Sequence, residues 1–414
     1  MRIVFLCDQY PPVVWDGAGT YTHAAAHALA GLGHDVHVVC CEGRRWEEKV
    51  DGRVSVHCRP VVVPPLSRLL GPFRRLVLGP HHPRDSLGLR ATLALSYAFW
   101  TWRLDLRPDV IETQEGESRA LIQALMGTVP LVICLHAPTM LGAHLQGAPL
   151  GWRGHLADRV DRLSADRAHT LTSFSQLLVD TLRTIGWLEN REPMIIPPPF
   201  HAEPWTTVPP VVDTDRTVLS VGRLEWIKGS HVLVEALAGL GARAEGARAV
   251  FAGSSSGLVE GRAYQAWLDE HARSLGVAAQ FLGAVPPAEM NEVYGRARVV
   301  AVPSRFESFS MVALEAMASG RPVVCSSRSG VAPLVERWGA GAVVEPDNPE
   351  ELAGALLPFL DSPEASAEAG ERGRACVRRE LDTTTVARLR EGAYRNAIDR
   401  HRRLRQRHAE APSC

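Results

Sequence analysis

Lysine is almost absent from this 414-residue chain: apart from Lys49 and Lys228, every one of its 45 basic side chains is an arginine. Arginine is therefore the default cation, and each lysine requires a local reason. An excess of either charge is also missing, because 46 acidic residues leave a formal net charge of −1. Such a chain has no global field to attract DNA, RNA or anionic lipid. We expect no nucleic-acid partner, and we interpret the basic run at 399–408 as a solvated helix end.

Long apolar runs and paired cysteine motifs are missing too. The longest apolar run, 91–102, falls short of the ~20 residues that a membrane-spanning helix needs, and the N-terminal run is too short for a signal peptide. The eight cysteines include no CxxC pair and show no zinc spacing. Several lie within apolar runs, which is typical of buried free thiols in a reducing compartment. We therefore expect a soluble, cytoplasmic protein.

Short apolar runs alternate with helical stretches along most of the chain, which predicts parallel sheets covered by helices on both faces. A Pro-rich stretch at 191–215 interrupts this pattern, which then restarts. The sequence thus predicts an α/β protein with two Rossmann-like, doubly wound domains facing a cleft, 1–200 and 210–384, with a C-terminal helix at about 385–414 that can pack back on the first. The expected strands cover 2–7, 35–40, 53–58, 109–113, 129–136, 169–173, 217–222, 247–253, 278–283, 298–304, 322–327 and 341–345.

Two glutamates eight residues apart form the strongest motif, within the stretch 305–324. Glu307 precedes an expected helix, and Glu315 lies roughly two turns into it. The helix start offers unpaired N–H groups to an anion, and carboxylates accept hydrogen bonds from sugar hydroxyls. A nucleotide sugar has both kinds of group. For the pair alone, an ordinary amphipathic helix with a solvated glutamate remains an alternative, but the flanking strand and the turn at 318–324 favour binding.

Arg223 and Lys228 supply counter-charges after the expected strand at 217–222. Arginine can fork onto phosphate oxygens, and lysine is a compact point charge that fits beside them. Gly222 and Gly229 allow a ligand to approach the backbone closely. Lys228 is therefore interpreted as a ligand of a diphosphate leaving group, and a plain surface lysine is the alternative.

The segments 220–229 and 281–324 resemble the donor domain of GT4-family retaining glycosyltransferases of GT-B fold, and 11–39 is similar to the start of that family's acceptor domain. The resemblance covers nearly the whole chain. It implies that Arg223 and Lys228 bind the donor diphosphate, that Glu315 accepts the ribose hydroxyls, and that Glu307 contacts the transferred sugar. Backbone contacts to sugar and phosphate oxygens are implied for Phe309, Ser310, Met311 and Val312.

Further roles follow from the same resemblance. The turn from Gly283 to Val285 matches the place where the family holds the base, and His136 matches a histidine near the sugar's 6-position. Gly17 and Gly19 match a glycine loop that faces the diphosphate. A buried or rim histidine is the alternative for His136, and a dinucleotide fingerprint is a weak alternative for the glycines. The catalytic candidates are His136, Glu307, Arg223 and Lys228.

The chain departs from the family pattern in three places. Ser310 stands where the family usually has glycine, and its hydroxymethyl group should narrow the space beside the transferred sugar. The stretch 197–200 replaces the usual turn between the domains. Pro333 lies where a glutamate is common, a change that nothing in the sequence explains. The Asp-Thr-Asp stretch at 213–215 resembles a metal-binding motif of other glycosyltransferases, but it precedes a strand and is interpreted as a turn, so we predict neither metal nor cofactor.

The expected reaction is front-face transfer from a nucleoside-diphosphate sugar by an enzyme of the hexosyltransferase type. Asp16, Glu115 and Glu117 are predicted to bind a small polar acceptor, and a positively charged acceptor such as an aminocyclitol would suit them; solvated loop acids are the alternative. The mixed basic and apolar stretch 64–90 suggests a second candidate, a lipid-linked acceptor on a membrane. A nucleotide-sugar epimerase of related fold is a third.

Overall fold

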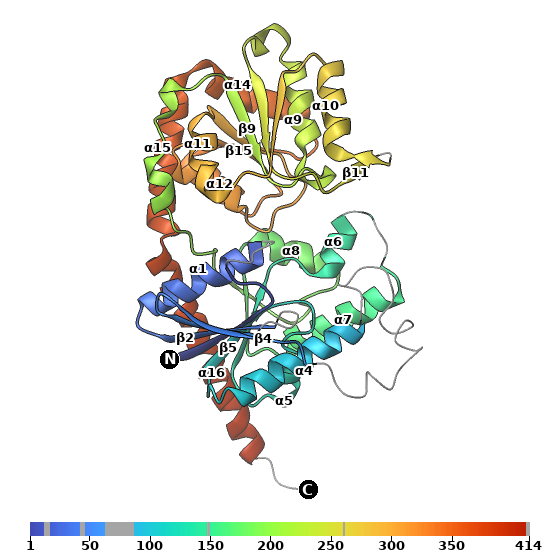
Figure 1. Ribbon diagram of the computed structural model, residues 1–414, viewed down its shortest axis with the longest axis vertical. Helices are drawn as coiled ribbons and strands as arrows, with labels where there is room; N and C mark the ends of the chain where they lie inside the picture. Colours follow the sequence, from blue (N-terminus) through green and yellow to red (C-terminus); the bar gives the residue numbers. More distant parts are fainter. Residues whose placement is uncertain are drawn as a thin grey trace. The chain divides into compact units, whose positions relative to one another are not determined.

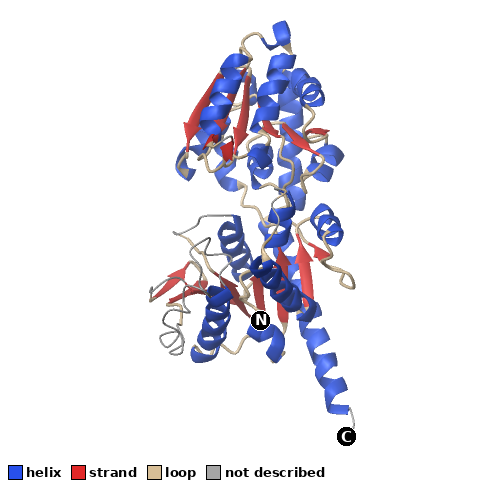
Figure 2. Ribbon diagram, turned by 90° about the vertical axis from the view of Figure 1, so that its right-hand side faces the viewer, coloured by secondary structure: helices blue, strands red, loops and turns tan. Residues whose placement is uncertain are grey.

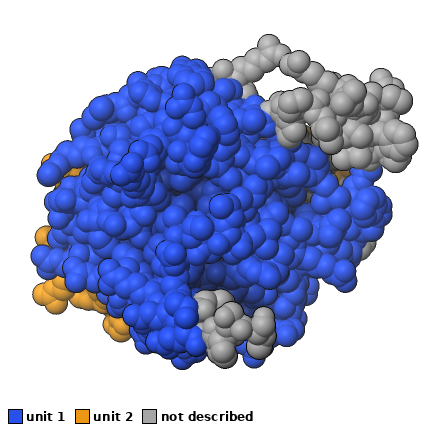
Figure 3. Space-filling model, turned by 90° about the horizontal axis from the view of Figure 1, so that it is seen from below, with its two compact units in different colours: residues 1–199, 383–414 blue, residues 200–382 orange. Residues whose placement is uncertain are grey.

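The structure, a computed structural model, describes residues 1–11, 17–41, 46–62, 87–145, 147, 150–259 and 261–410. The chain forms two compact units (Figure 3): unit 1 is Met1–Pro199 with Thr383–Cys414, and unit 2 is Phe200–Asp382. Each unit is a sheet with helices on both of its faces (Figures 1 and 2). The predicted fold class, α/β with two Rossmann-like domains, is confirmed.

Unit 1 is built on an eight-stranded sheet in the order β3-β4-β2-β1-β5-β6-β7-β8. Its central strands are buried along almost their whole length, because helices cover both faces. The edge strand β3 runs antiparallel to β4, and the sequence pattern did not predict it. The strands are β1 Arg2–Cys7, β2 Asp35–Cys41, β3 Glu47–Asp51, β4 Val54–Arg59, β5 Val110–Gln114, β6 Leu131–Leu135, β7 Thr170–Ser173 and β8 Met194–Ile195.

The helices of unit 1 include the last one of the chain, α16, which packs against α1 and contacts β5, β6 and β7. Because α16 runs without a break from Thr383 to Glu410, the single long helix expected at the C-terminus is confirmed. The described helices are α1 Gly17–Gly31, α4 Leu87–Arg103, α5 Leu121–Met126, α6 Thr139–Leu145, α7 Trp152–Arg167, α8 Gln176–Thr184 and α16 Thr383–Glu410.

A buried ion pair ties α16 to the centre of the sheet. Arg390 donates from one guanidinium nitrogen to both carboxylate oxygens of Glu112 on β5, at 3.0 Å each. The hydroxyls of Tyr21 and Tyr394 donate to the same carboxylate at 2.5 Å, and the Arg390 guanidinium also lies over the Tyr21 ring. Both ionic side chains are about 1% exposed. The pair therefore connects two residues that are 278 positions apart in the sequence, within the core of unit 1.

Unit 2 has a six-stranded, fully parallel sheet in the order β13-β10-β9-β14-β15-β16, with a separate short hairpin. Its first strand β9 pairs with both β10 and β14, so the strand order reverses at this point, where doubly wound sheets bind ligands. The strands are β9 Thr217–Val221, β10 Arg248–Ala252, β11 Leu258–Val259, β12 Arg262–Ala263, β13 Ala279–Gly283, β14 Val299–Val302, β15 Val323–Ser326 and β16 Gly341–Val344.

Helices follow most of these strands, as the alternating pattern predicts. In the core of unit 2, α9 packs against α14, and α12 packs against α15. The α-helices are α9 Ser230–Gly239, α10 Tyr264–Ser274, α11 Met290–Gly295, α12 Met311–Ala318, α13 Ala332–Trp338, α14 Pro349–Asp361 and α15 Pro363–Glu380; the 3-10 turns are η2 Glu203–Thr207, η3 Val211–Asp213, η4 Trp226–Lys228, η5 Gly241–Ala244 and η6 Pro287–Glu289.

Two expectations from composition can be compared with this fold. The seven cysteines within the described residues are all free and buried, as predicted. Among the helices of the described part of the chain, none has the length and apolar character to cross a bilayer. Most of the stretch 64–90, on which the membrane-surface alternative rests, lies outside the described residues.

Candidate functional site

The carboxyl ends of β9 and β14 bring the predicted lysine and glutamate together. Lys228 closes the turn after β9, and Glu307 lies in the loop that follows β14; the Lys228 Nζ donates to the Glu307 Oε1 at 2.7 Å. The hydroxyl of Ser304 donates to the same oxygen at 3.0 Å. The two ionic side chains keep 26% and 18% of their surface exposed. The pair is therefore ordered and still open to a ligand.

A glycine is required directly after this lysine. Gly229 has a φ of +69°, and a Cβ atom at this position would lie 2.1 Å from the carbonyl oxygen of Pro303. Only glycine combines this backbone conformation with so close an approach. The turn from η4 into α9 thus lies against the end of β14, which places Lys228 beside the loop that carries Glu307.

The start of α12 is the place where the sequence predicts that an anion binds, and its local geometry is well defined. Ser310 is the residue before the helix, and its Oγ accepts a hydrogen bond from the Ala313 N–H at 3.3 Å. Its φ is +99°, a region that glycine adopts without cost and other residues rarely enter. The structure therefore explains both the family's glycine and the serine found here: the backbone requires a positive φ, and the hydroxyl caps the helix. The carbonyl of Phe309 accepts bonds from Val331 and Ser329.

Glu315 lies on α12 and has a partner that the sequence did not reveal. The hydroxyl of Tyr294, which is fully buried on α11, donates to its Oε2 at 2.7 Å. Burial raises the pKa of Glu315 to about 7, and the bond from Tyr294 acts in the opposite direction. The only sequence signal for Tyr294 is its place in a short amphipathic helix, which is typical of any core residue.

Arg223 does not join the pair of Lys228 and Glu307. Its guanidinium is 63% exposed and lies 3.0 Å from the carboxylate of Glu225. The preceding Gly222 has a φ of +137°, and its carbonyl is so close to Gly253 that a Cβ there would lie 1.9 Å from it. The backbone of this turn is held tightly, whereas the arginine side chain is at the surface.

The turn predicted to hold a base borders a cavity of unit 2. Gly283 ends β13 with a φ of +69° and accepts a hydrogen bond from the Gly253 N–H at 2.7 Å. Val285 and Pro286 follow it and line a cavity of about 370 Å³. The rest of its lining comes from β9, β10, β13 and the segment that includes α11. This turn therefore has accessible space beside it.

In unit 1, Glu115 has a structural role that the sequence did not predict. Its carboxylate follows β5 and accepts the backbone N–H groups of His136 and Ala137, at 2.8 and 2.7 Å, directly after β6. Burial raises its pKa to about 7, while His136 and the two N–H donors pull it down. Glu115 is 9% exposed. Glu115 therefore orients the segment that carries His136. Both of its carboxylate oxygens are already engaged, so it does not offer a free carboxylate to a cationic acceptor.

The other candidates in unit 1 have mixed outcomes. The His136 ring packs edge-on against Tyr21 and Phe174, with centroids 5.0 and 4.5 Å away. The Glu117 carboxylate lies 3.3 Å from the Arg119 guanidinium. The predicted glycine loop is helical where it is described, because α1 begins at Gly17 and includes Gly19. Asp16 lies outside the described residues. The structure leaves the predicted roles of His136 and the glycines as predictions.

The Asp-Thr-Asp stretch behaves as a turn. It spans the end of η3 and the residues before β9, and the Thr214 hydroxyl donates to the Val211 carbonyl at 2.6 Å. Asp215 pairs with Arg248 at 3.1 Å. Its carboxylate thus has a partner inside unit 2.

Two family models match the chain, and together they span most of it. "Glycosyl transferase 4-like domain" matches residues 16–199, and "Glycosyl transferases group 1" matches residues 203–375. This protein is a GT4-type glycosyltransferase of GT-B fold. It is therefore an enzyme, and the resemblance drawn from its motifs is confirmed.

Individual relatives agree with this assignment. The chain is 29% identical to the glycogen synthase of Mycobacterium tuberculosis over 94% of its own length and 92% of that protein. Sucrose-phosphate synthase from Thermosynechococcus elongatus has a similar fold, with a TM-score of 0.75 at 20% identity, covering 96% of this chain and 99% of that one. Anabaena HepE, solved in complex with UDP-glucose, gives a TM-score of 0.65 at 20% identity, covering 94% and 98%.

Proposed function

We propose that this glycosyltransferase moves a hexosyl group, with retention, from a nucleoside-diphosphate sugar to a small polar acceptor. The observation that carries the proposal is the contact of Lys228 with Glu307 beside the start of α12. A cation, a carboxylate and a helix N-terminus in one place suit a ligand with a diphosphate next to a sugar.

Unit 2 would bind the donor in the following way. Lys228 turns from Glu307 to the diphosphate and stabilises the negative charge that develops as it leaves. Glu307, released from that ion pair, accepts hydroxyls of the transferred sugar. Glu315 accepts the ribose hydroxyls, and Tyr294 fixes the orientation of its carboxylate. Arg223 is exposed enough to reach a bound phosphate from the surface.

The chemistry proposed for the transfer is front-face displacement. The glycosidic bond to the diphosphate breaks, the acceptor oxygen attacks from the same face, and a phosphate oxygen takes the acceptor's proton. No protein nucleophile is required, and the protein contributes position and charge stabilisation. The role of His136 toward the transferred sugar and the absence of a catalytic metal remain predictions drawn from the resemblance.

UDP-glucose is the first donor to test, because HepE was solved with that molecule. The acceptor is proposed to be small and polar. Of the acids predicted to bind a positively charged acceptor, Glu115 is engaged with backbone N–H groups and Glu117 is paired with Arg119, while Asp16 lies outside the described residues. The seven buried free thiols favour a cytoplasmic location.

Thermal unfolding with a panel of nucleotide sugars tests the proposal. UDP-glucose, UDP-N-acetylglucosamine, ADP-glucose and GDP-mannose are added separately to the whole chain. A true donor at 100 times its Kd stabilises the native state by about 2.7 kcal/mol, and Lys228→Met removes that gain. Arg273→Met is the control, because Arg273 is an exposed residue on α10 of the same unit. A panel without any stabilising member, or a gain that survives Lys228→Met, contradicts the proposal.

A further inference from the structure

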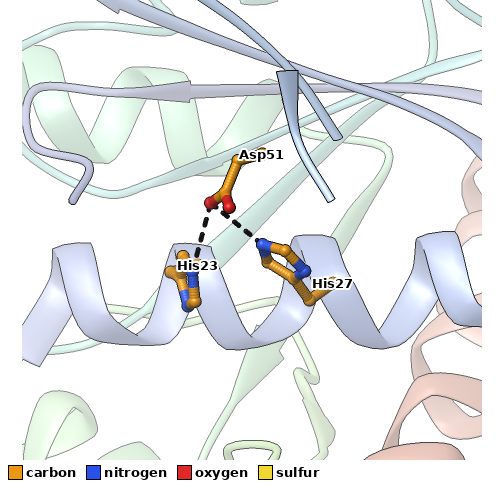
Figure 4. Close-up of side chains that lie close together, drawn as sticks. All are labelled: His23, His27 and Asp51. Atoms are coloured by element: carbon orange, nitrogen blue, oxygen red, sulfur yellow. Dashed lines mark hydrogen bonds and ion pairs between the residues drawn. The ribbon is translucent and has the colours of Figure 1, made fainter. Parts of the chain in front are cut away.

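Two histidines and an aspartate of unit 1, none of which has a role in the proposed function, lie close together. His23 and His27 are four residues apart on α1, so both side chains emerge from the same face of the helix. Asp51 ends β3 and points toward them (Figure 4). The two Nε2 atoms lie 3.3 and 3.0 Å from the Asp51 Oδ2. One potential ligand atom from each of the three residues lies within 4.8 Å of the other two.

This set of atoms is a recognised kind of metal-ligand set. Two imidazole nitrogens and one carboxylate oxygen suit zinc and its neighbours among the divalent transition metals, whereas Mg²⁺ and Ca²⁺ prefer oxygen alone. Three protein ligands leave a fourth position for water or another small ligand. A histidine pair at i and i+4 on one helix presents two nitrogens to the same ion.

The surroundings of the cluster orient these ligands. The Tyr10 hydroxyl donates to the Asp51 carboxylate at 3.1 Å, the kind of outer contact that fixes a metal-binding carboxylate. Gly52 makes room for the second histidine, because a Cβ there would lie 3.2 Å from the His27 Cε1, and its φ of +59° favours glycine. The three ligand side chains are all partly buried, between about one third and two fifths exposed. An ion can therefore enter from solvent.

One cation near the cluster, Lys49, opposes the binding of a metal ion. Its Nζ donates to the Pro11 carbonyl at 2.5 Å and lies 5.7 Å from the Tyr10 ring centroid.

We propose that His23, His27 and Asp51 form a binding site for a divalent transition-metal ion of the zinc class. A bound ion would fasten the hairpin of β3 and β4 to α1 through direct bonds, in place of the hydrogen bonds seen between the same side chains. None of its three ligands is among the residues proposed to bind the donor, and its test does not depend on glycosyl transfer.

Metal binding by the whole chain is measured first. Zn²⁺ is titrated against a chromophoric chelator at pH 7, with EDTA-treated wild type, His23→Ala, His27→Ala and Asp51→Asn. We expect one equivalent bound by wild type and at least about 10-fold weaker binding by each variant. Tyr10→Phe should weaken binding about 10-fold, the low end of the range for lost outer contacts. His155→Ala is the control, because His155 is an exposed histidine on α7. Lys49→Met should tighten binding, because it removes the nearby positive charge.

A second readout separates loss of the site from loss of the fold. Co²⁺ bound by wild type should give visible absorption bands of a low-symmetry N/O site, and the double variant H23A/H27A should not. In EDTA the variants should melt cooperatively, whereas Zn²⁺ should raise the melting temperature of wild type alone. If the double variant is unfolded, His23→Asn and His27→Asn replace it. Equal Zn²⁺ uptake by wild type and the double variant, or Asp51→Asn binding as tightly as wild type, overturns the proposal.

Discussion

In unit 1, Glu112 and Glu115 have both of their carboxylate oxygens engaged within the fold, one with Arg390 and two tyrosines and the other with backbone N–H groups. In unit 2, Glu307 forms a partly exposed ion pair with Lys228. Glu315 accepts one hydrogen bond, from Tyr294, on one of its oxygens. A carboxylate that lies within a parallel strand or just after one can therefore either stabilise the fold or bind a ligand. Their partners distinguish the two roles, because a binding carboxylate needs a partner that a ligand can replace.

The largest effect should come from breaking the buried pair of unit 1. Arg390→Met leaves the Glu112 carboxylate without its cation in the core, which should lower the free energy of unfolding by about 3–5 kcal/mol. The double variant E112Q/R390M should recover much of this loss, because no charge remains buried. Urea unfolding of both variants measures the difference. A loss below about 1 kcal/mol in Arg390→Met would show that the pair does not hold α16 in place.

The second effect concerns the open pair of unit 2. Lys228→Met should lower kcat/KM by about 10²- to 10³-fold, the usual cost of removing one group that stabilises the departing charge. The melting temperature should change little, because both partners are partly exposed. Steady-state kinetics with the donor found in the panel measures it, and Arg273→Met should retain wild-type kinetics. Large destabilisation with unchanged kcat/KM would show that Lys228 stabilises the fold and does not act on the donor.

The third effect is a pH dependence located at Glu315. Its pKa of about 7 in the fold exceeds the ordinary value of 4.5, so between these values the native state binds more protons than the unfolded state. The free energy of unfolding should therefore fall as pH rises from about 4.5 to 7, by up to roughly 3 kcal/mol from this group. Glu315→Gln should reduce this fall and leave the part that comes from Glu115, whose pKa burial also raises to about 7. A profile identical to wild type would mean that Glu315 ionises normally.

The fourth effect compares two neighbouring acids of unit 1. Glu115→Gln has one acceptor oxygen for two N–H donors, so it should lose about 1–3 kcal/mol of stability and lower kcat by displacing His136. Glu117→Gln removes only a partly exposed ion pair and should cost less than about 1 kcal/mol. A higher acceptor KM in Glu117→Gln would support a cationic acceptor. Equal stability of the two variants would remove the distinction between them.

The smallest effect tests the conformation before α12. Ser310→Gly should stabilise the protein by about 1 kcal/mol, because relief of the positive φ exceeds the few tenths lost with the cap. Ser310→Ala keeps the strained φ and loses the cap, so it should cost about 1 kcal/mol. Thermal unfolding of the two variants gives the signs. Shifts in the same direction would contradict this explanation of the serine.

Much of the fold follows from local pattern. Apolar runs and helical spacing predicted nearly all parallel strands and the long last helix, because these signals are contained within about ten residues. The edge strand β3 was missed, since its sequence Glu47–Asp51 is mostly polar and it is defined by its pairing with β4. The partnership of Tyr294 with Glu315 was missed for the same reason, because it depends on how α11 packs beside α12.

By itself, the sequence determined the two α/β halves, the family, and the lysine and glutamates to examine, because periodicity and short motifs are properties of neighbouring residues. The tertiary structure alone decided which of those charges remain available. It buried Glu115 against backbone N–H groups, left Arg223 at the surface, and brought Asp51 to His23 and His27 across 24 or more positions. A carboxylate's role depends on the donors that reach it, and those donors come from distant parts of the chain that only folding brings together.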